Sequence, residues 1–199
     1  MSQSENLSSA AVKVVESALQ AGIDVRLKTI STLPPLISQA AEQIIEVLQE
    51  GGKVLLCGNG GSAATAQHLA GELCGRYLAE RRPLAAIALT ADSSVLTCIG
   101  NDYDYQDIFS RQVNALGQPD DILIAFTTSG KSPNVIKAIS TAKEQGLWTL
   151  ALTGEKGLQG SIPDFVLAVP SNITARIQEE HDAIIHAICD LIDINFAEV

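Results

Sequence analysis

Residues 53–62 read KVLLCGNGGS, which predicts a buried strand running straight into a glycine-rich turn. The apolar run before the first glycine has the length and composition of a strand covered on both faces. Four further runs of this kind follow, at residues 84–89, 121–126, 148–152 and 165–169. Helical stretches of ten or more residues separate most of these runs. This alternation predicts a parallel sheet with helices on both faces.

The expected helices number about seven. They cover residues 5–28, 34–48, 63–76, 93–116 with a break near Asn101, 134–145 and 174–196. The first two precede every strand and are amphipathic, so we expect an N-terminal helical hairpin, residues 1–52, that serves in oligomerisation. Residues 53–199 then form the α/β core with its long C-terminal helix. The whole chain, 1–199, is predicted as one domain, a three-layer sandwich around a five-stranded parallel sheet.

Composition excludes several classes of protein. The chain of 199 residues carries 13 Lys and Arg against 23 Asp and Glu, a net charge of −10, so neither nucleic acid nor an anionic membrane is an expected partner. The four cysteines show no paired spacing and are expected to be reduced, mostly buried thiols. The opening MSQSENLSS lacks the features of a signal peptide, and no apolar run reaches about 20 residues. We expect a cytoplasmic protein.

Two loops follow predicted strands, where parallel sheets bind ligands. Residues 127–133 read TTSGKSP, so hydroxyl groups and free N–H groups gather at a helix start and favour a phosphate site, to which Lys131 adds charge. The alternative is an ordinary capping loop; a Walker loop is excluded because Ala125 stands where that motif needs glycine. The turn GNGGS suits an anion or a sugar hydroxyl, and Ser62 is suited to cap the next helix. It lacks the third glycine of a dinucleotide site.

Titratable residues concentrate on two predicted helices. His68 and Glu72 are four residues apart and share one face, which suits two ligands of one metal, a base beside its partner, or a plain surface pair. The C-terminal helix offers Gln178, His181 and His186. Helical spacing alone slightly favours His181 over His186 as the neighbour of Gln178.

Seven segments, in this order along the chain, carry a resemblance to a known family. They are CGNGGS at 57–62, QHLAGEL at 67–73, GRY at 75–77, IGNDYDYQDIFSRQV at 99–113, TTSGKSPNVIKAI at 127–139, ALTG at 151–154 and RIQEEHDAIIH at 176–186. Together they resemble the SIS (sugar isomerase) family, and within it the phosphoheptose isomerases. The resemblance covers nearly the whole chain and implies the SIS fold.

The resemblance implies a set of site residues. Glu72 and His186 match the family's acid/base pair, and His186 is selected over His181. The matching zinc ligands, one ion per subunit, are His68, Glu72, Gln178 and His186. The matching substrate contacts are Asn59, Gly60, Gly61, Ser62, Glu72, Asn101, Asp102, Gln178 and, for the phosphate, Thr127, Thr128, Ser129 and Ser132. The loop departs from the family's usual Ser-Thr-Ser-Gly-Asn-Ser at Thr127 and Lys131, and Gly71 stands where a helix former is expected.

The implied activity is aldose–ketose isomerisation of sedoheptulose 7-phosphate to D-glycero-D-manno-heptose 7-phosphate through an enediol(ate). In the family this is the first step of ADP- or GDP-heptose synthesis, which supplies lipopolysaccharide precursors, and the enzyme is a homotetramer. Two other functions are compatible with the same fold. Proteins that bind a replication initiator lack the acid at position 72 and the histidine at 186, both present here. A sugar-phosphate-sensing domain would need the phosphate loop but not that pair.

Overall fold

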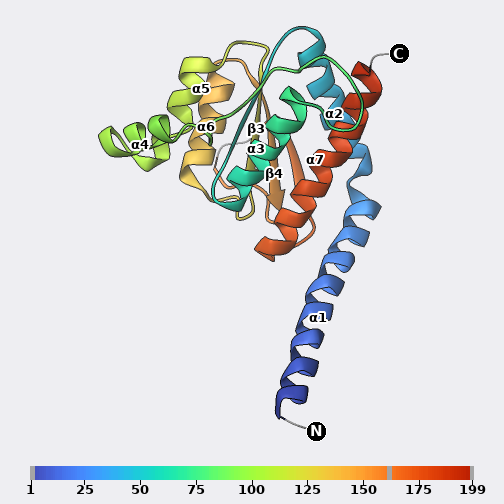
Figure 1. Ribbon diagram of the computed structural model, residues 1–199. Coiled ribbons are helices and arrows are strands. Elements are labelled where there is room, and N and C mark those ends of the chain that lie inside the picture. The colour runs from blue at the N-terminus through green and yellow to red at the C-terminus, as the bar shows by residue number, and fades with distance from the viewer. Residues whose placement is uncertain (1–2, 161–162, 198–199) are drawn as a thin grey trace.

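The structure, a computed structural model, describes residues 3–160 and 163–197 (Figure 1). Its sheet has the order β2–β1–β3–β4–β5, and all neighbouring strands are parallel. The strands are β1 Val54–Gly58, β2 Ala86–Ala88, β3 Ile122–Thr127, β4 Trp148–Gly154 and β5 Phe165–Val169. The helices are α1 Gln3–Thr32, α2 Pro34–Gln49, α3 Gly61–Cys74, α4 Ser93–Asp102, η1 Tyr105–Asp107, α5 Ser110–Leu116, α6 Pro133–Glu144 and α7 Thr174–Phe196. The predicted five strands and about seven α-helices are confirmed in this part of the chain.

The sheet is the middle of three layers because alternate strand residues pack on opposite faces. Leu56 and Phe126 belong to the core formed with α2, α3 and α7. Leu55 and Ala125 belong to the core formed with α5 and α6. Every residue of β1 and β3 is buried, which explains their nearly continuous apolar sequence. The carboxyl ends of these two central strands therefore lie side by side.

The N-terminal helices differ in one respect from the expected hairpin. Only Leu33 separates α1 from α2, and it stays helical: its N–H bonds to Thr29 and its carbonyl accepts from Ile37. Pro34 and Pro35 lack N–H donors and bend the chain here without reversing it. The result is a bent pair of helices, of which α1 projects far beyond the α/β body (Figure 1).

Among the side chains of α1 that the structure describes, residues 10–32, those that anchor this helix to the body lie in its second half. Arg26 pairs with Glu180 of α7 at 2.8 Å, and Glu180 is 2% exposed. Before that point Val14 and Leu19 are 70% and 66% exposed. An apolar surface of this kind on an isolated chain marks an interaction face.

The segment between β2 and β3 breaks as expected, and the reason is capping. Asp92 accepts hydrogen bonds from two N–H groups at the start of α4, and Asp104 accepts one at the start of η1. Two acids placed this way start separate short helices in place of one long helix. The strand predicted over residues 84–89 is shorter in the structure, reduced to β2.

Three expectations concern features outside the sheet. Residues 1–2 of the segment inspected for a signal lie outside the described residues. No helix in the described ranges combines the length and apolarity needed to cross a bilayer. All four cysteines are free, but only Cys57 and Cys189 are buried; Cys74 and Cys98 are exposed, so the expectation of mostly buried thiols is half right.

Candidate active site

Helices α3 and α7 lie side by side on one face of the sheet and run in the same direction (Figure 1). Three contacts join them in order. A Cβ on Gly61 would overlap the amide of Gln178, Thr65 Oγ1 donates to Asp182 Oδ1 at 2.8 Å, and His68 Nε2 lies 3.3 Å from His186 Nε2. Gln178, Asp182 and His186 are four residues apart and so share one face of α7.

The third contact is part of a cluster of metal-ligating side chains. His68 Nε2 lies 3.1 Å from Glu72 Oε1 as well as 3.3 Å from His186 Nε2. One ligand atom from each of His68, Glu72 and His186 lies within 4.8 Å of the others. All three come from one chain, so α7 brings His186 to His68 and Glu72 without a second copy.

The cluster fits a divalent cation. Two nitrogen ligands at 2.0–2.1 Å from a tetrahedral zinc ion are about 3.3 Å apart, which is the spacing that His68 and His186 already have. Two ring nitrogens and a carboxylate oxygen pointing at one another are the donor set of a catalytic zinc centre. A groove runs between α3 and α7, and both Gln178 and His68 line it. The amide of Gln178 packs there against Gly61.

Tyr77 forms one wall of the cluster. Its ring stacks on His186, with the centroids 5.5 Å apart and 23° between the planes. Burial raises the pKa of Tyr77, and the neighbouring acids Asp190 and Glu72 raise it further, so the phenol keeps its proton at neutral pH. Tyr77 thus fixes the plane of the His186 ring. The GRY segment at 75–77 contributes to the family resemblance, but the sequence analysis assigns no site role to Tyr77.

His181 lies elsewhere, as the family resemblance implied. Its side chain is fully buried, and Nε2 lies 3.3 Å from the carbonyl oxygen of Thr153 at the end of β4. Burial lowers the pKa of His181 to about 4. It is a neutral core histidine behind the groove, and the spacing that made it the neighbour of Gln178 did not predict the site.

The hydroxyl-rich loop is a compact turn at the carboxyl end of β3. Gly130, at φ 66°, donates to Thr127 Oγ1, and Lys131 N–H donates to Ser129 Oγ. A Cβ at Gly130 would strike the carbonyl of Gly157, so only glycine fits. Thr128, Ser129 and Lys131 line a hollow of about 200 Å³ that Lys156 also lines.

The neighbouring loop is tied to this one by amide pairing. Asn59 and Asn134 exchange two hydrogen bonds of 2.8 Å, and Tyr105 donates to Asn59 Oδ1 at 3.3 Å. Ser132 lines a second hollow with Asn59. Gly60 precedes α3 at φ 57°, and Ser62 lies buried within its first turn, so the expectation that Ser62 caps this helix is wrong.

Asn101 and Asp102 are not brought to the groove. They end α4, which packs on η1 and stands out on the side of α5 and α6, away from α7 (Figure 1). Both are exposed, and Asn101 donates to the carboxylate of Asp102 at 2.7 Å. Within one chain these two predicted substrate contacts are separate from the others.

The comparisons with known proteins agree with this geometry. The SIS domain model matches residues 19–154. The chain belongs to the SIS domain family. It is 55% identical over 161 residues to a phosphoheptose isomerase of Campylobacter jejuni, covering 80% of this chain and 87% of that one. A phosphoheptose isomerase of Shewanella loihica is 50% identical over 184 residues, 90% of this chain and 93% of the relative.

Solved structures confirm the fold. The phosphoheptose isomerase of Neisseria gonorrhoeae superimposes with a TM-score of 0.85 at 43% identity, covering 92% of this chain and 99% of that one. The resemblance seen in the sequence is therefore confirmed, and the chain is an enzyme of the sugar-phosphate isomerase class.

Four contributing residues escaped the sequence analysis. Thr65 and Asp182 bond across the groove, Asn134 holds Asn59, and Lys156 joins the hollow of the hydroxyl-rich loop. A signal existed only for Asp182, which is four residues from both Gln178 and His186. The others depend on contacts between segments far apart in the sequence.

Proposed function

We propose that the chain interconverts sedoheptulose 7-phosphate and D-glycero-D-manno-heptose 7-phosphate. The observation that carries the proposal is the cluster of His68, Glu72 and His186 in a chain 55% identical to a phosphoheptose isomerase. The reaction removes a proton from C1 of the ketose, passes through an enediol(ate), and returns a proton to C2 of the aldose. A second proton moves between the two oxygens. The site must therefore offer a carbon base and a group that serves the oxygens.

Glu72 is the proposed carbon base, and His186 the group that gives and takes the proton at the oxygens. Glu72 is half-buried on α3, and its Oε1 bonds to His68 at 3.1 Å, which fixes its position. Stacking on Tyr77 orients the His186 ring. Glu72 and His186 lie close enough together to reach the same two carbons and oxygens of one bound substrate, as proton transfer requires.

The proposed phosphate site is the loop of Thr127, Thr128, Ser129 and Ser132 at the N-terminus of α6. Hydroxyl and N–H donors combine there with the helix dipole, and Lys131 adds a positive charge. Phosphate binding far from the reacting carbons positions them against Glu72. Asn59, Gly60, Gly61, Ser62, Asn101 and Asp102 are proposed to contact the sugar.

The proposed metal is one zinc ion per subunit, held by His68, Glu72, Gln178 and His186. When bound, it supplies positive charge beside the carbonyl and enediolate oxygens. Glu72 and His186 would therefore serve both as ligands of the ion and as the groups that move protons. The cluster is partly open to solvent, since the His68 side chain is 40% exposed and that of Glu72 20%.

We further propose a cytoplasmic homotetramer that supplies heptose precursors, including those of lipopolysaccharide. The apolar surface of α1 supports assembly, with Leu19 66% and Ile23 52% exposed. Asn101 and Asp102 would reach a substrate only in an assembly that brings α4 to another subunit's groove. Free cysteines, two of them exposed, suit a reducing compartment.

The test is product formation from sedoheptulose 7-phosphate, followed by NMR, with zinc added and with a chelator. The proposal expects an aldoheptose 7-phosphate with zinc and its loss with the chelator. Absence of conversion by folded, zinc-supplied protein would contradict the proposed substrate. Equal conversion under both conditions would contradict the metal.

A further inference from the structure

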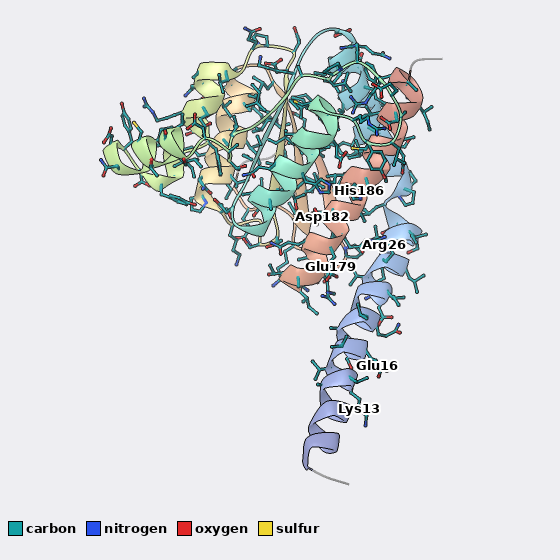
Figure 2. The ribbon with its side chains drawn as sticks, in the orientation of Figure 1. Lys13, Glu16, Arg26, Glu179, Asp182 and His186 are labelled. Atoms are coloured by element: carbon teal, nitrogen blue, oxygen red, sulfur yellow. The ribbon has the colours of Figure 1, made fainter. Side chains whose placement is uncertain are left out.

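The middle contact between α3 and α7 carries a carboxylate to which no role has been given. Asp182 lies one helical turn after Gln178 and one before His186, and Figure 2 shows it on α7 beside His186, on the side toward α3. A pocket of about 380 Å³ opens there, lined by Gly61, Ala64, Thr65, His68, Gln178 and Asp182. Asp182 therefore faces the space between the strand ends and the metal-ligand cluster.

The carboxylate is held in place by a neutral side chain. Its Oδ1 accepts the hydroxyl of Thr65 at 2.8 Å, and Thr65 is 4% exposed. Among the described residues no lysine or arginine forms an ion pair with Asp182, which is half-buried at the pocket wall. A carboxylate accepts several hydrogen bonds, so the acceptor sites that Thr65 leaves free are open to donors from water or from a bound molecule.

The position of Asp182 suggests what those donors are. At about 1.5 Å per residue, Thr65 lies about 6 Å along α3 from Gly61 and about 10 Å before Glu72. A sugar phosphate anchored at the strand ends with its reacting carbons at Glu72 places its middle carbons here. Those carbons carry only hydroxyl groups, which donate readily to a carboxylate, whereas an anionic group would be repelled.

We propose that Asp182, positioned by Thr65, binds hydroxyl groups of the substrate's middle carbons and so contributes to the choice of sugar phosphate. The inference rests on the proposed function and deepens it. Asp182 is a substrate-binding residue, and Thr65 a positioning residue that acts through it. Gln178, one turn away, offers an amide that both donates and accepts to the same run of hydroxyls.

The test compares Asp182→Asn with the wild-type chain. Asparagine keeps the size of the side chain and an oxygen that accepts from Thr65, and removes the charge. We expect KM for sedoheptulose 7-phosphate to rise about 10- to 100-fold, as for loss of a charged hydrogen bond, with kcat changed much less. Inhibition by inorganic phosphate, which lacks the polyol, should stay within about twofold of wild type.

Matched variants separate binding from structure. Asp120→Asn makes the same chemical change at an exposed turn far from the groove, where Asp120 has φ 72°, and should leave KM unchanged. Thr65→Val, which loses the hydroxyl, should raise KM as Asp182→Asn does. Thr65→Ser, which keeps the hydroxyl, should have a KM close to that of the wild type. The double variant with Asp182→Asn should add less than the two single effects combined.

Three results would overturn the inference: an unchanged KM in folded Asp182→Asn, a parallel weakening of phosphate inhibition, or a lower zinc content in that variant. If Asp182→Asn fails to fold, the Thr65→Val and Thr65→Ser pair decides by the same KM readout. Calorimetric binding of sedoheptulose 7-phosphate accompanies the kinetics. A wild-type chain that binds the sugar phosphate without converting it contradicts only the proposed function, and Asp182→Asn must then weaken that binding.

Discussion

The groove between α3 and α7 and the tip of α4 were both predicted to contact substrate, and only the first is assembled within one chain. In the groove, His68 and His186 are 118 residues apart in sequence and 3.3 Å apart in space. At the tip of α4, Asn101 and Asp102 are exposed and bond to each other. Helices packed on the sheet bring their side chains together, whereas a helix projecting from the body needs another molecule to complete its contacts.

The largest expected effect is at Glu72. Glu72→Gln removes the proposed base and keeps the shape of the side chain, so turnover should fall about 10²- to 10⁴-fold. Inhibition by inorganic phosphate measures the hydroxyl-rich loop separately and should be nearly unchanged. Turnover at the wild-type rate in this variant would contradict the catalytic role proposed for Glu72 in the groove.

Metal binding is the next largest difference between the two regions. Zinc should raise the melting temperature of the wild-type chain, because a ligand at 100 times its Kd stabilises the folded state by about 2.7 kcal/mol. His186→Ala should lose most of this shift, and Asn101→Ala should keep it. Calorimetric scans with and without zinc make the comparison. Equal shifts in both variants would place the metal outside the groove.

Assembly should matter for α4 and not for zinc. Leu19→Glu puts a charge into the exposed apolar stripe of α1, where Leu19 is 66% exposed, and should yield a smaller species in light scattering. That species should still bind zinc through the groove but should lose turnover. Adding Asn101→Ala to Leu19→Glu should lower turnover no further. An assembly of unchanged size in Leu19→Glu would contradict the role proposed for α1.

The last prediction concerns the core behind the groove, where the effect appears only at acid pH and leaves activity at neutral pH unchanged. Burial lowers the pKa of His181 to about 4, so the folded state prefers the neutral ring. The unfolded chain binds the proton first as the pH falls below the ordinary value of about 6.5. This contribution to stability is therefore complete above about pH 6.5 and is lost toward pH 4, by at most about 1.4 kcal/mol per pH unit. Urea unfolding at several pH values should show a weaker pH dependence in His181→Gln.

Sequence patterns predicted the sheet and its helices because buried strands and amphipathic helices have distinct periods. They missed the bend at Leu33, since two prolines at a helix start indicate where a helix begins and not how the preceding one meets it. They predicted one helical stretch over residues 93–116 with a break near Asn101. The structure has separate helices there, and an aspartate caps each of the first two, α4 and η1.

The site was predicted unevenly for a physical reason. His68 and Glu72 share one helix, so spacing alone pairs them, but His186 was selected over His181 only by family resemblance. Their difference is burial: His181 faces the sheet and His186 faces α3. The pairs Thr65–Asp182 and Asn59–Asn134 join segments far apart in the sequence, and no local sequence pattern predicts such contacts.

The most direct test follows deuterium from solvent into the sugar phosphate. Wild-type chain with zinc and sedoheptulose 7-phosphate in D₂O is monitored by NMR at C1 of the ketose and C2 of the aldose. The account predicts deuterium at the reacting carbons with the wild-type chain, and its loss in Glu72→Gln even when substrate is bound. Exchange that persists in Glu72→Gln would show that another group moves the proton and that Glu72 is not the base.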